Sequence, residues 1–318
     1  MCRVLGLDGG GTKTIAAIAD RSGTVLDLSF NVGLDPTAGP GWEGLLAEIV
    51  APFGRVDAAA LGLPFHGEIS AVSARQIAVA AQLIGPQAQV LNDVAVAFEG
   101  ALAGESGVLI LAGTGSMAWA RGPRGTVRSG GWGDAFGDEG SAYWIGREAL
   151  SIVSHHLDGR KAAPAFAENL LDRIGIPAEA LIGWTYLRAN LRAGIASVAA
   201  NVSALALQGD AEAKQLMDRA AWHLAELGRA VATVSGLTAP VPWSYAGGVF
   251  RDAGLLAAVT RAMGPVPAPP RLPPVGGAIL CAAKAAGWAI DDGFIARLGS
   301  TLAASLCQNS NTAALVTS

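Results

Sequence analysis

Cysteine is scarce in this sequence, and its scarcity excludes two kinds of site. The 318 residues include only three cysteines, Cys2, Cys281 and Cys307. They lie too far apart along the chain to suggest a disulfide framework or the closely spaced ligand pairs of a structural zinc site. We therefore expect neither a disulfide-stabilised fold nor a cysteine-ligated metal.

Charged residues are also few, and no long apolar run is present. Charged side chains make up 15% of the chain, with a formal net charge of −4, which gives no basic surface for nucleic acid. Mean hydropathy is +0.40, yet no apolar run approaches the roughly 20 residues of a membrane span. The chain starts almost directly on a strand-like segment, with no signal peptide visible. We expect a cytoplasmic protein that binds neither nucleic acid nor membrane.

What the chain does contain is ample material for a core. Hydrophobic residues make up 51% of it, and its length favours two domains or one large one. Strand-like and helical segments alternate over the first hundred or so residues, which favours an α/β domain. We expect strands at 4–8, 14–20, 24–30, 57–63 and 89–92, and helices at 42–53, 70–84 and 95–103. A long helix is expected at 139–156, and mostly helical structure from 164 to 236.

The opening pattern returns later in the chain. "LDGGGTKTIAAIADRSGTV" (7–25) is echoed by "LAGTGSMAWARGPRGTV" (111–127). In both segments a strand meets a Gly/Thr loop, a second strand follows, and a Gly-Thr-Val turn leads to a third. The echo could be chance, or it could mark a duplicated domain in which each half offers a glycine-rich loop to a shared cleft.

Three glycine-rich loops follow expected strands. In the first, Gly9, Gly10 and Gly11 would let backbone N–H groups approach an anion closely. Gly113–Ser116 forms the second loop and Gly247-Gly248 the third. One such loop could be only a tight turn, but three at strand ends favour a bound nucleotide. The spacing is neither that of a P-loop nor that of a dinucleotide-binding turn, because a hairpin follows the first loop.

A further segment, "GGWGDAFGDEGSAYWIG" (130–146), combines glycines with aromatic rings and acids. A linker does not need Trp132 and Trp144, and a core strand does not tolerate Asp134, Asp138 and Glu139. The segment is therefore expected to hold a ligand that needs close backbone, a flat apolar face and fixed carboxylates.

The order of these motifs with "LND" (91–93) and "AGGVF" (246–250) resembles the BadF/BadG/BcrA/BcrD family of ATPases, and within it the N-acetylglucosamine kinases. These belong to the actin–hexokinase–heat-shock superfamily, and the likeness spans roughly residues 3–290. It implies a two-lobed α/β fold, actin-like and ribonuclease H-like, with an interdomain cleft. The first lobe would span 1–105, and a helix at about 291–305 could return to it. The second lobe, with a helical insertion, would span 106–290.

The resemblance implies ATP and Mg²⁺ as cofactors. Asp8 would lie near Mg²⁺, through a water molecule, and Asp93 would be the general base. The alternative for Asp93 is a cap on the helix that follows it. The positions that match ATP- and phosphate-binding motifs are Gly9, Gly10, Gly11, Thr12, Lys13, Gly113, Thr114, Gly115, Gly247 and Gly248.

The resemblance also implies a sugar site. Trp132 could pack on the apolar face of a sugar ring, and Asp138 could accept hydrogen bonds from two hydroxyls. The alternative for Asp138 is a helix cap, and His66 and Glu68 are left open as cleft residues. Asp35 stands where such kinases often place an Asn, and it has no amide donor, so N-acetylglucosamine, glucosamine and other sugars remain open. The positions implied for the sugar are Asp35, Asn92, Ser116, Gly131, Trp132, Gly133 and Asp138.

The expected activity is therefore ATP-dependent phosphorylation of an amino-sugar hydroxyl. The expected partner is a small-molecule sugar, and a homodimer stays open. One alternative is an ATPase that activates a 2-hydroxyacyl-CoA dehydratase or reductase through an iron–sulfur cluster, which the scattered cysteines disfavour. Another is a sugar-sensing regulator of the same fold, which usually carries an N-terminal helix-turn-helix.

Overall fold

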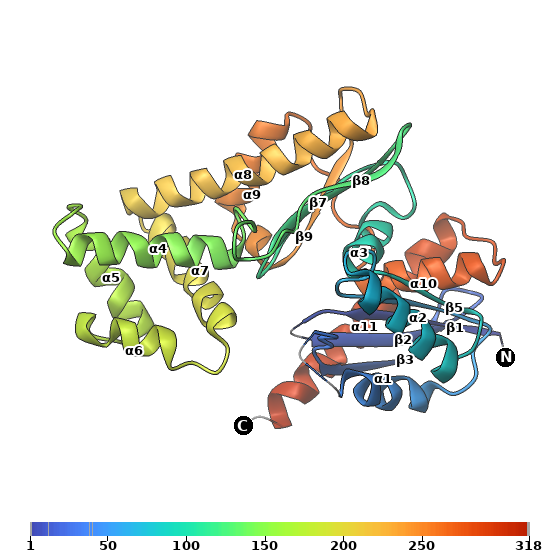
Figure 1. The fold of residues 1–318 in the computed structure, drawn as a ribbon. Helices are drawn as coiled ribbons and strands as arrows, with labels where there is room; N and C mark the ends of the chain where they lie inside the picture. The colour runs from blue at the N-terminus through green and yellow to red at the C-terminus, as the bar shows by residue number, and fades with distance from the viewer. Residues whose placement is uncertain (1, 12, 38, 40, 317–318) are drawn as a thin grey trace. The chain divides into compact units, whose positions relative to one another are not determined.

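The computed structural model describes residues 2–11, 13–37, 39 and 41–316, and it contains two compact units (Figure 1). Unit 1 comprises Met1–Glu105 and Pro269–Ser318, and unit 2 comprises Ser106–Ala268. The expected second lobe ran to residue 290, whereas residues 269–290 belong to unit 1. The physical reason is α10 (Pro274–Ala285), which packs on β1 (Arg3–Gly9) and buries most of its residues there.

The sheet of unit 1 has five strands in the order β3-β2-β1-β4-β5. The first three form an antiparallel meander, and β4 and β5 then run parallel to β1. Every residue of β4 is buried, as expected of a strand covered on both faces. The remaining strands are β2 (Lys13–Asp20), β3 (Val25–Val32), β4 (Ala58–Leu63) and β5 (Ala88–Asn92).

Helices cover both faces of this sheet. On one face, α1 (Trp42–Val50), extended by a 3-10 turn at Ala51–Phe53, and α2 (Ser70–Leu83) share a core with β1, β2 and β4. On the other, α10 and α11 (Asp292–Val316) form a second core. A Cβ on Gly62 of β4 would be 2.3 Å from Cγ2 of Val96 in α3 (Asp93–Leu102). The glycine therefore lets α3 pack directly against the central strands.

The sheet of unit 2 has four strands in the order β8-β7-β6-β9. β6, β7 and β8 form a second antiparallel meander, and β9 adds parallel to β6. Both segments of the sequence echo thus fold into the same meander, extended by parallel strands beside its first strand, which favours duplication over chance. The strands are β6 (Gly107–Ala112), β7 (Ser116–Gly122), β8 (Gly125–Gly130) and β9 (Trp243–Ala246).

Most of the remaining residues of unit 2 are helical, as the sequence predicts. Helix α8 packs against β6, β7 and β8, and one core joins it to the sheet and to the other helices. No single helix of the described residues is long and apolar enough to cross a membrane; α7 and α8 pass that test only as a pair, bent by 118°. The helices are α4 (Ala142–Leu157), α5 (Pro164–Ile174), α6 (Leu181–Tyr186), α7 (Leu191–Leu207), α8 (Ala211–Ser235) and α9 (Ala253–Met263), with 3-10 turns at Ala178–Ala180 and Gly248–Arg251.

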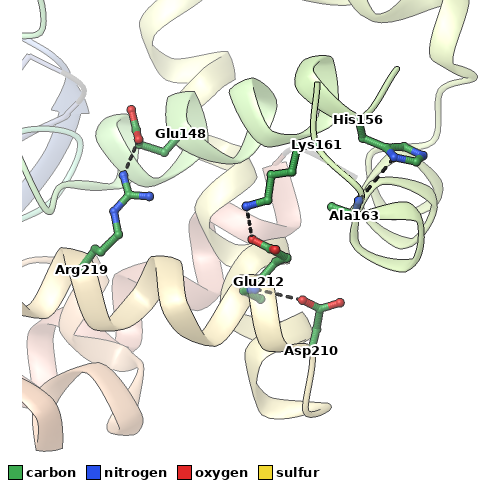
Figure 2. Close-up of polar contacts among 8 residues, drawn as sticks. Glu148, His156, Lys161, Ala163, Asp210, Glu212 and Arg219 are labelled. Atoms are coloured by element: carbon green, nitrogen blue, oxygen red, sulfur yellow. Dashed lines mark hydrogen bonds and ion pairs between the residues drawn. The ribbon is translucent and has the colours of Figure 1, made fainter. Parts of the chain in front are cut away.

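Polar contacts connect these helices at their surface (Figure 2). Arg219 of α8 donates to Glu148 of α4, and Nζ of Lys161 lies 2.5 Å from Oε2 of Glu212. The carboxylate of Asp210 caps α8 by accepting from the N–H of Ala213 at 2.9 Å. These contacts fix α4 and the segment that follows it against the N-terminal half of α8.

Candidate functional site

Three strand ends of unit 1 bring the expected catalytic side chains to one edge of the sheet. Asp8 of β1 is paired with Gly62 of β4, and Leu63 of β4 is paired with Asn92 of β5, in parallel register. Parallel strands place their carboxyl ends at the same edge, which is where α/β proteins bind ligands. Asp93 follows β5 directly as the first residue of α3.

Both carboxyl groups at this edge have raised pKa values. Burial and the negative charge of Asp93 together raise the pKa of Asp8 to about 7, against the opposing positive charge of Lys13. Burial and, to a smaller extent, the negative charge of Glu68 raise the pKa of Asp93 to about 6, against the opposing hydrogen bond from the N–H of Val94. The ionised forms therefore lack full compensation by positive charge.

This edge fits a magnesium ion carried by a nucleotide. Among the described residues, no group of three or more His, Cys, Asp or Glu side chains could hold a metal ion by itself. Mg²⁺ usually keeps several waters and is held by one or two carboxylates together with substrate phosphates. Asp8 and Asp93, with raised pKa values, are carboxyls of the kind that such a cation would stabilise.

Asn92 is the residue before α3, and its side chain caps the helix. Its Oδ1 accepts from the N–H of Val94 at 2.9 Å. Its Nδ2 donates to the carbonyl of His66 at 3.0 Å and lies 3.4 Å from Oε1 of Glu68. Oδ1 of Asp93 also accepts from the same Val94 N–H, at 2.9 Å, so the cap does not depend on Asp93 alone.

The loop after β4 contains two residues that the sequence left open, and α2, which follows this loop, contains one that it missed. His66 and Glu68 both lie beside Asn92 through the contacts just described. Gln76 of α2 is fully buried; its Nε2 donates to the carbonyl of Pro64 at 2.8 Å, and its Oε1 lies 3.0 Å from Nδ1 of His66. Phe65 has a left-handed backbone, with φ of 63°. Strained backbone of this kind is concentrated at functional sites. For Gln76, the only signal in the sequence is that it is a polar residue within an amphipathic helix.

The first glycine loop of unit 1 closes the β1–β2 hairpin. The N–H of Gly10 donates to the carbonyl of Lys13 at 3.0 Å, and a Cβ on Gly11 would meet nothing within 4 Å. Gly9 is buried at the end of β1 and the side chain of Lys13 is exposed. Thr12, the residue expected to touch the nucleotide phosphate, lies outside the described residues.

Asp35 lies beside this hairpin, because the N–H of Leu34 donates to the carbonyl of Gly10 at 3.0 Å. Its Oδ1 accepts from the N–H of Thr37 at 2.8 Å and from the Thr37 hydroxyl at 2.6 Å. One carboxylate oxygen of Asp35 is therefore engaged in a local turn.

In unit 2, the second and third glycine loops meet at adjacent strand ends. Leu111 of β6 is paired with Ala246 of β9 in parallel register. Gly247 has φ of 101°, and a Cβ on it would be 2.2 Å from the carbonyl oxygen of Ala112, so only glycine fits there. A Cβ on Gly113 or on Gly248 would meet nothing within 4 Å.

The second loop is fixed by the start of α4. The N–H of Ala142 donates to the carbonyl of Gly113 at 2.9 Å, and that of Tyr143 donates to the carbonyl of Thr114 at 3.2 Å. The side chain of Thr114 remains exposed, whereas Ser116 is buried and its hydroxyl donates to the carbonyl of Glu139 at 2.7 Å. The loop therefore has a fixed backbone and one exposed hydroxyl.

Asp138 is held by contacts other than a helix cap. Ser141 caps α4 by accepting from the N–H of Trp144 at 3.1 Å, so the capping alternative for Asp138 is wrong and α4 begins at Ala142 rather than Glu139. Asp138 is buried and accepts from the N–H of Ser116 at 3.2 Å and from Nη2 of Arg192 at 2.6 Å. Burial raises the pKa of Asp138, and these two donors oppose the shift.

Trp132 presents a large open surface in the same loop. It is 63% exposed, and the guanidinium carbon of Arg128 lies 5.2 Å from the centroid of its ring. The N–H of Gly131 donates to the carbonyl of Ser116 at 3.0 Å, and a Cβ on Gly133 would meet nothing within 4 Å. Unit 2 thus brings together Ser116, Trp132 and Asp138, and unit 1 brings together Asp8, Asn92 and Asp93.

Similarity to known proteins identifies the family of the chain. The model of the BadF/BadG/BcrA/BcrD ATPase family matches residues 5–282. The chain belongs to this family. It is 32% identical over 170 residues to an N-acetylmuramic acid/N-acetylglucosamine kinase of Clostridium acetobutylicum. That alignment covers 52% of the chain and spans only 56% of the length of the relative.

Solved structures confirm the fold class expected from the sequence. A candidate N-acetylglucosamine kinase from Chromobacterium violaceum is similar with a TM-score of 0.74 and 27% identity, over 88% of this chain and 98% of that one. A ROK family glucokinase from Streptomyces griseus, solved with glucose and AMPPNP, is similar with a TM-score of 0.58 and 20% identity, over 89% and 98%. This protein therefore has the two-lobed α/β fold of sugar kinases and actin-like ATPases.

Proposed function

We propose that the protein is an ATP-dependent sugar kinase that phosphorylates a hydroxyl of an amino sugar such as N-acetylglucosamine or glucosamine. The observation that carries this proposal is the pair Asp8 and Asp93 at one strand edge of an ATPase-family fold, both with raised pKa values. Kinase chemistry needs one carboxylate near the metal and one near the acceptor hydroxyl. The named activities of the similar proteins support the same reaction.

Asp93 would act as the general base. A base works best when its pKa lies close to the working pH, and a pKa of about 6 leaves Asp93 mostly ionised at neutral pH. Asp8 would hold Mg²⁺ through water, and the metal, when bound, would neutralise phosphate charge. The groups proposed for ATP are Gly9, Gly10, Gly11, Thr12, Lys13, Gly113, Thr114, Gly115, Gly247 and Gly248.

The sugar would be recognised mainly by Trp132 and Asp138. The exposed ring of Trp132 offers an apolar face, and the carboxylate of Asp138 offers charged acceptors for hydroxyls. In the local turn, both hydrogen bonds to Asp35 are made to Oδ1. The other carboxylate oxygen would favour a donor such as a hydroxyl or an ammonium. The further residues proposed at this site are Asn92, Ser116, Gly131 and Gly133.

A panel of acceptors tests the proposal directly. ADP release is measured with ATP and Mg²⁺ in the presence of N-acetylglucosamine, glucosamine, N-acetylmuramic acid or glucose, and without any sugar. We expect release that depends on an amino sugar and is lost with excess EDTA, and NMR of the product identifies the phosphorylated hydroxyl. Release that no sugar stimulates would contradict a kinase and leave only an ATPase.

A further inference from the structure

Arg192 is the cation that contacts the carboxylates of the 130–138 loop, although it lies 54 residues beyond Asp138 in sequence. It is the second residue of α7, whose first turn is capped by the side chain of Asn190 at 2.9 Å from the N–H of Ala193. Its Nη2 lies 2.6 Å from Oδ2 of Asp138, and its Nε lies 3.6 Å from Oδ1 of Asp134. One guanidinium therefore spans two acids of the loop.

The contact with Asp138 is made in a restrained setting. The backbone of Asp138 is left-handed, with φ of 60°, and its side chain is 3% exposed. Such a conformation persists only where surrounding contacts over-determine it. The Asp138 carboxylate therefore has one orientation, set by the N–H of Ser116 on one oxygen and by Arg192 on the other.

Counting acceptor sites shows what that orientation leaves available. An ionised carboxylate has about four lone-pair sites, and the structure uses one on each oxygen of Asp138. One site on each oxygen remains, which matches two neighbouring hydroxyls of a sugar. Rotation of the carboxyl group would misplace both remaining sites together.

The adjoining glycine loop packs on the same ion pair. A Cβ on Gly115 would lie 2.9 Å from Nη2 of Arg192 and 2.9 Å from each carboxylate oxygen of Asp138. The space beside Gly115 is thus taken by both partners of the ion pair, and a side chain at this position would displace them. Within the described residues, Nε of Arg192 is buried and has no hydrogen-bond partner, so the guanidinium is held mainly through Nη2 and this packing.

We propose that Arg192 is a positioning residue of the acceptor site, which orients the Asp138 carboxylate so that its remaining lone pairs receive two hydroxyls of the sugar. Arg192 acts through Asp138 and touches no reacting atom. The inference rests on the proposed kinase function, and it extends that function to a residue outside the sequence motifs from which the sugar site was predicted.

Arg192→Met tests this role, with Arg192→Lys and Arg219→Met beside it. Lys keeps the positive charge but lacks the planar fork that fixes a carboxylate. Arg219 is a matched control because it also pairs with a carboxylate of unit 2, that of Glu148 (Figure 2). Steady-state KM for sugar and for ATP, kcat and melting temperature are measured for each variant and for the wild type.

We expect Arg192→Met to raise the sugar KM by about tenfold or more, the usual loss when a charge-assisted hydrogen bond is removed, with ATP KM nearly unchanged. Arg192→Lys should recover part of this loss, and Arg219→Met should leave the sugar KM at the wild-type value. If Arg192→Met does not fold, Arg192→Lys carries the test, because a wild-type sugar KM in that variant would overturn the proposal.

Two other results would also overturn it. An unchanged sugar KM in Arg192→Met would overturn the proposed role of Arg192, whereas sugar-dependent turnover by the wild type would still support the kinase function. Equal increases in the sugar and ATP KM values, with a lowered melting temperature, would show a structural role only. A wild-type protein without sugar-dependent ADP release would remove the kinase function itself, and the inference with it.

Discussion

The two units share a β-meander, but their buried aspartates differ in whether a guanidinium pairs with them. In unit 1, Asp8 and Asp93 lie at strand ends on one edge of the sheet. Burial disfavours the ionised form of both carboxyls and raises their pKa values. In unit 2, Asp138 is buried beside the guanidinium of Arg192. Carboxyls without full compensation by positive charge are suited to accept a proton or bind a metal, whereas a carboxylate paired with a cation is suited to fixed hydrogen bonding.

Aspartate is therefore expected to have a different role in each unit. A change at Asp93 should alter the chemical step, and a change at Asp138 should alter binding of the acceptor. The same Asp→Asn exchange in each unit separates these effects, because it preserves shape and removes the charge.

Asp93→Asn should have the largest effect. Losing a general base typically costs about 10²–10⁴ in rate. Oδ1 of the new amide can still accept from Val94, and Asn92 also accepts from that N–H, so stability should change by less than about 1 kcal/mol. Turnover is measured at saturating sugar and ATP, with denaturant unfolding as the control for folding. A variant that keeps more than about a tenth of wild-type turnover would rule out Asp93 as the base.

Asp138→Asn should act on the acceptor instead. The NH2 group of the new amide would face either the Ser116 N–H or Arg192, which are both donors. The exchange also removes the negative charge that would accept hydrogen bonds from the sugar hydroxyls. A hydrogen bond to a charged group contributes about 1.5–3 kcal/mol, so the sugar KM should rise about 10- to 100-fold. ATP affinity, followed by calorimetry, should stay near the wild-type value. A loss of ATP affinity as large as the loss for sugar would mean that Asp138 does not act on the acceptor in particular.

Gly113→Val tests the nucleotide side of unit 2. The new Cβ would meet nothing within 4 Å in the protein, so the fold should accept it, while the branched side chain should keep a phosphate away from the loop. Loss of even one charge-assisted hydrogen bond predicts about tenfold or more weaker ATP binding. Gly183→Val in α6 is the control, because a Cβ there makes only an ordinary contact, 3.8 Å from Leu187. Equal ATP affinity in the two variants would exclude Gly113 from the phosphate site.

Much of the fold follows from local patterns in the sequence. The repeated meander, the strand ends at Asp8 and Asp93 and the helical segment of unit 2 all follow from short apolar runs and glycine punctuation. Element boundaries were less accurate. The expected start of α4 at Glu139 missed the Ser141 cap, and α11 extends to Val316 rather than to about 305.

The contacts that orient the site could not be predicted in the same way. Arg192 meets Asp138 because α7 packs against α4, which follows the 130–138 loop, and no local pattern links residues so far apart. Gln76 is likewise an ordinary helix residue until its burial beside His66 is known. The return of residues 269–290 to unit 1 depends on the packing of α10 against β1, which is also a tertiary property.

The smallest expected effect concerns the pH dependence of unit 1. If Asp93 is the base, it must be ionised, so kcat/KM should fall as pH drops through the pKa of about 6. Burial is the main cause of that raised pKa, and the negative charge of Glu68 adds to it. Removing this charge by Glu68→Gln should therefore lower the pKa of Asp93 and move the acidic limb to lower pH. Because Glu68 is exposed, solvent screens its charge, and the move should be less than about one pH unit.

The amide oxygen introduced by Glu68→Gln could still accept from Asn92, which keeps the local contact that Glu68 makes at 3.4 Å. Glu43→Gln is the matched control, because Glu43 also belongs to unit 1 but pairs with Arg75 and is absent from the charges that shift Asp93. The kcat/KM profile between pH 5 and pH 8, roughly the range that spans this limb, distinguishes the variants. A limb that stays in place in Glu68→Gln, or that moves as far in Glu43→Gln, would show that the measured pKa does not belong to Asp93. In that case the difference between the incompletely compensated carboxyls of unit 1 and the paired carboxylate of unit 2 would not support Asp93 as the base.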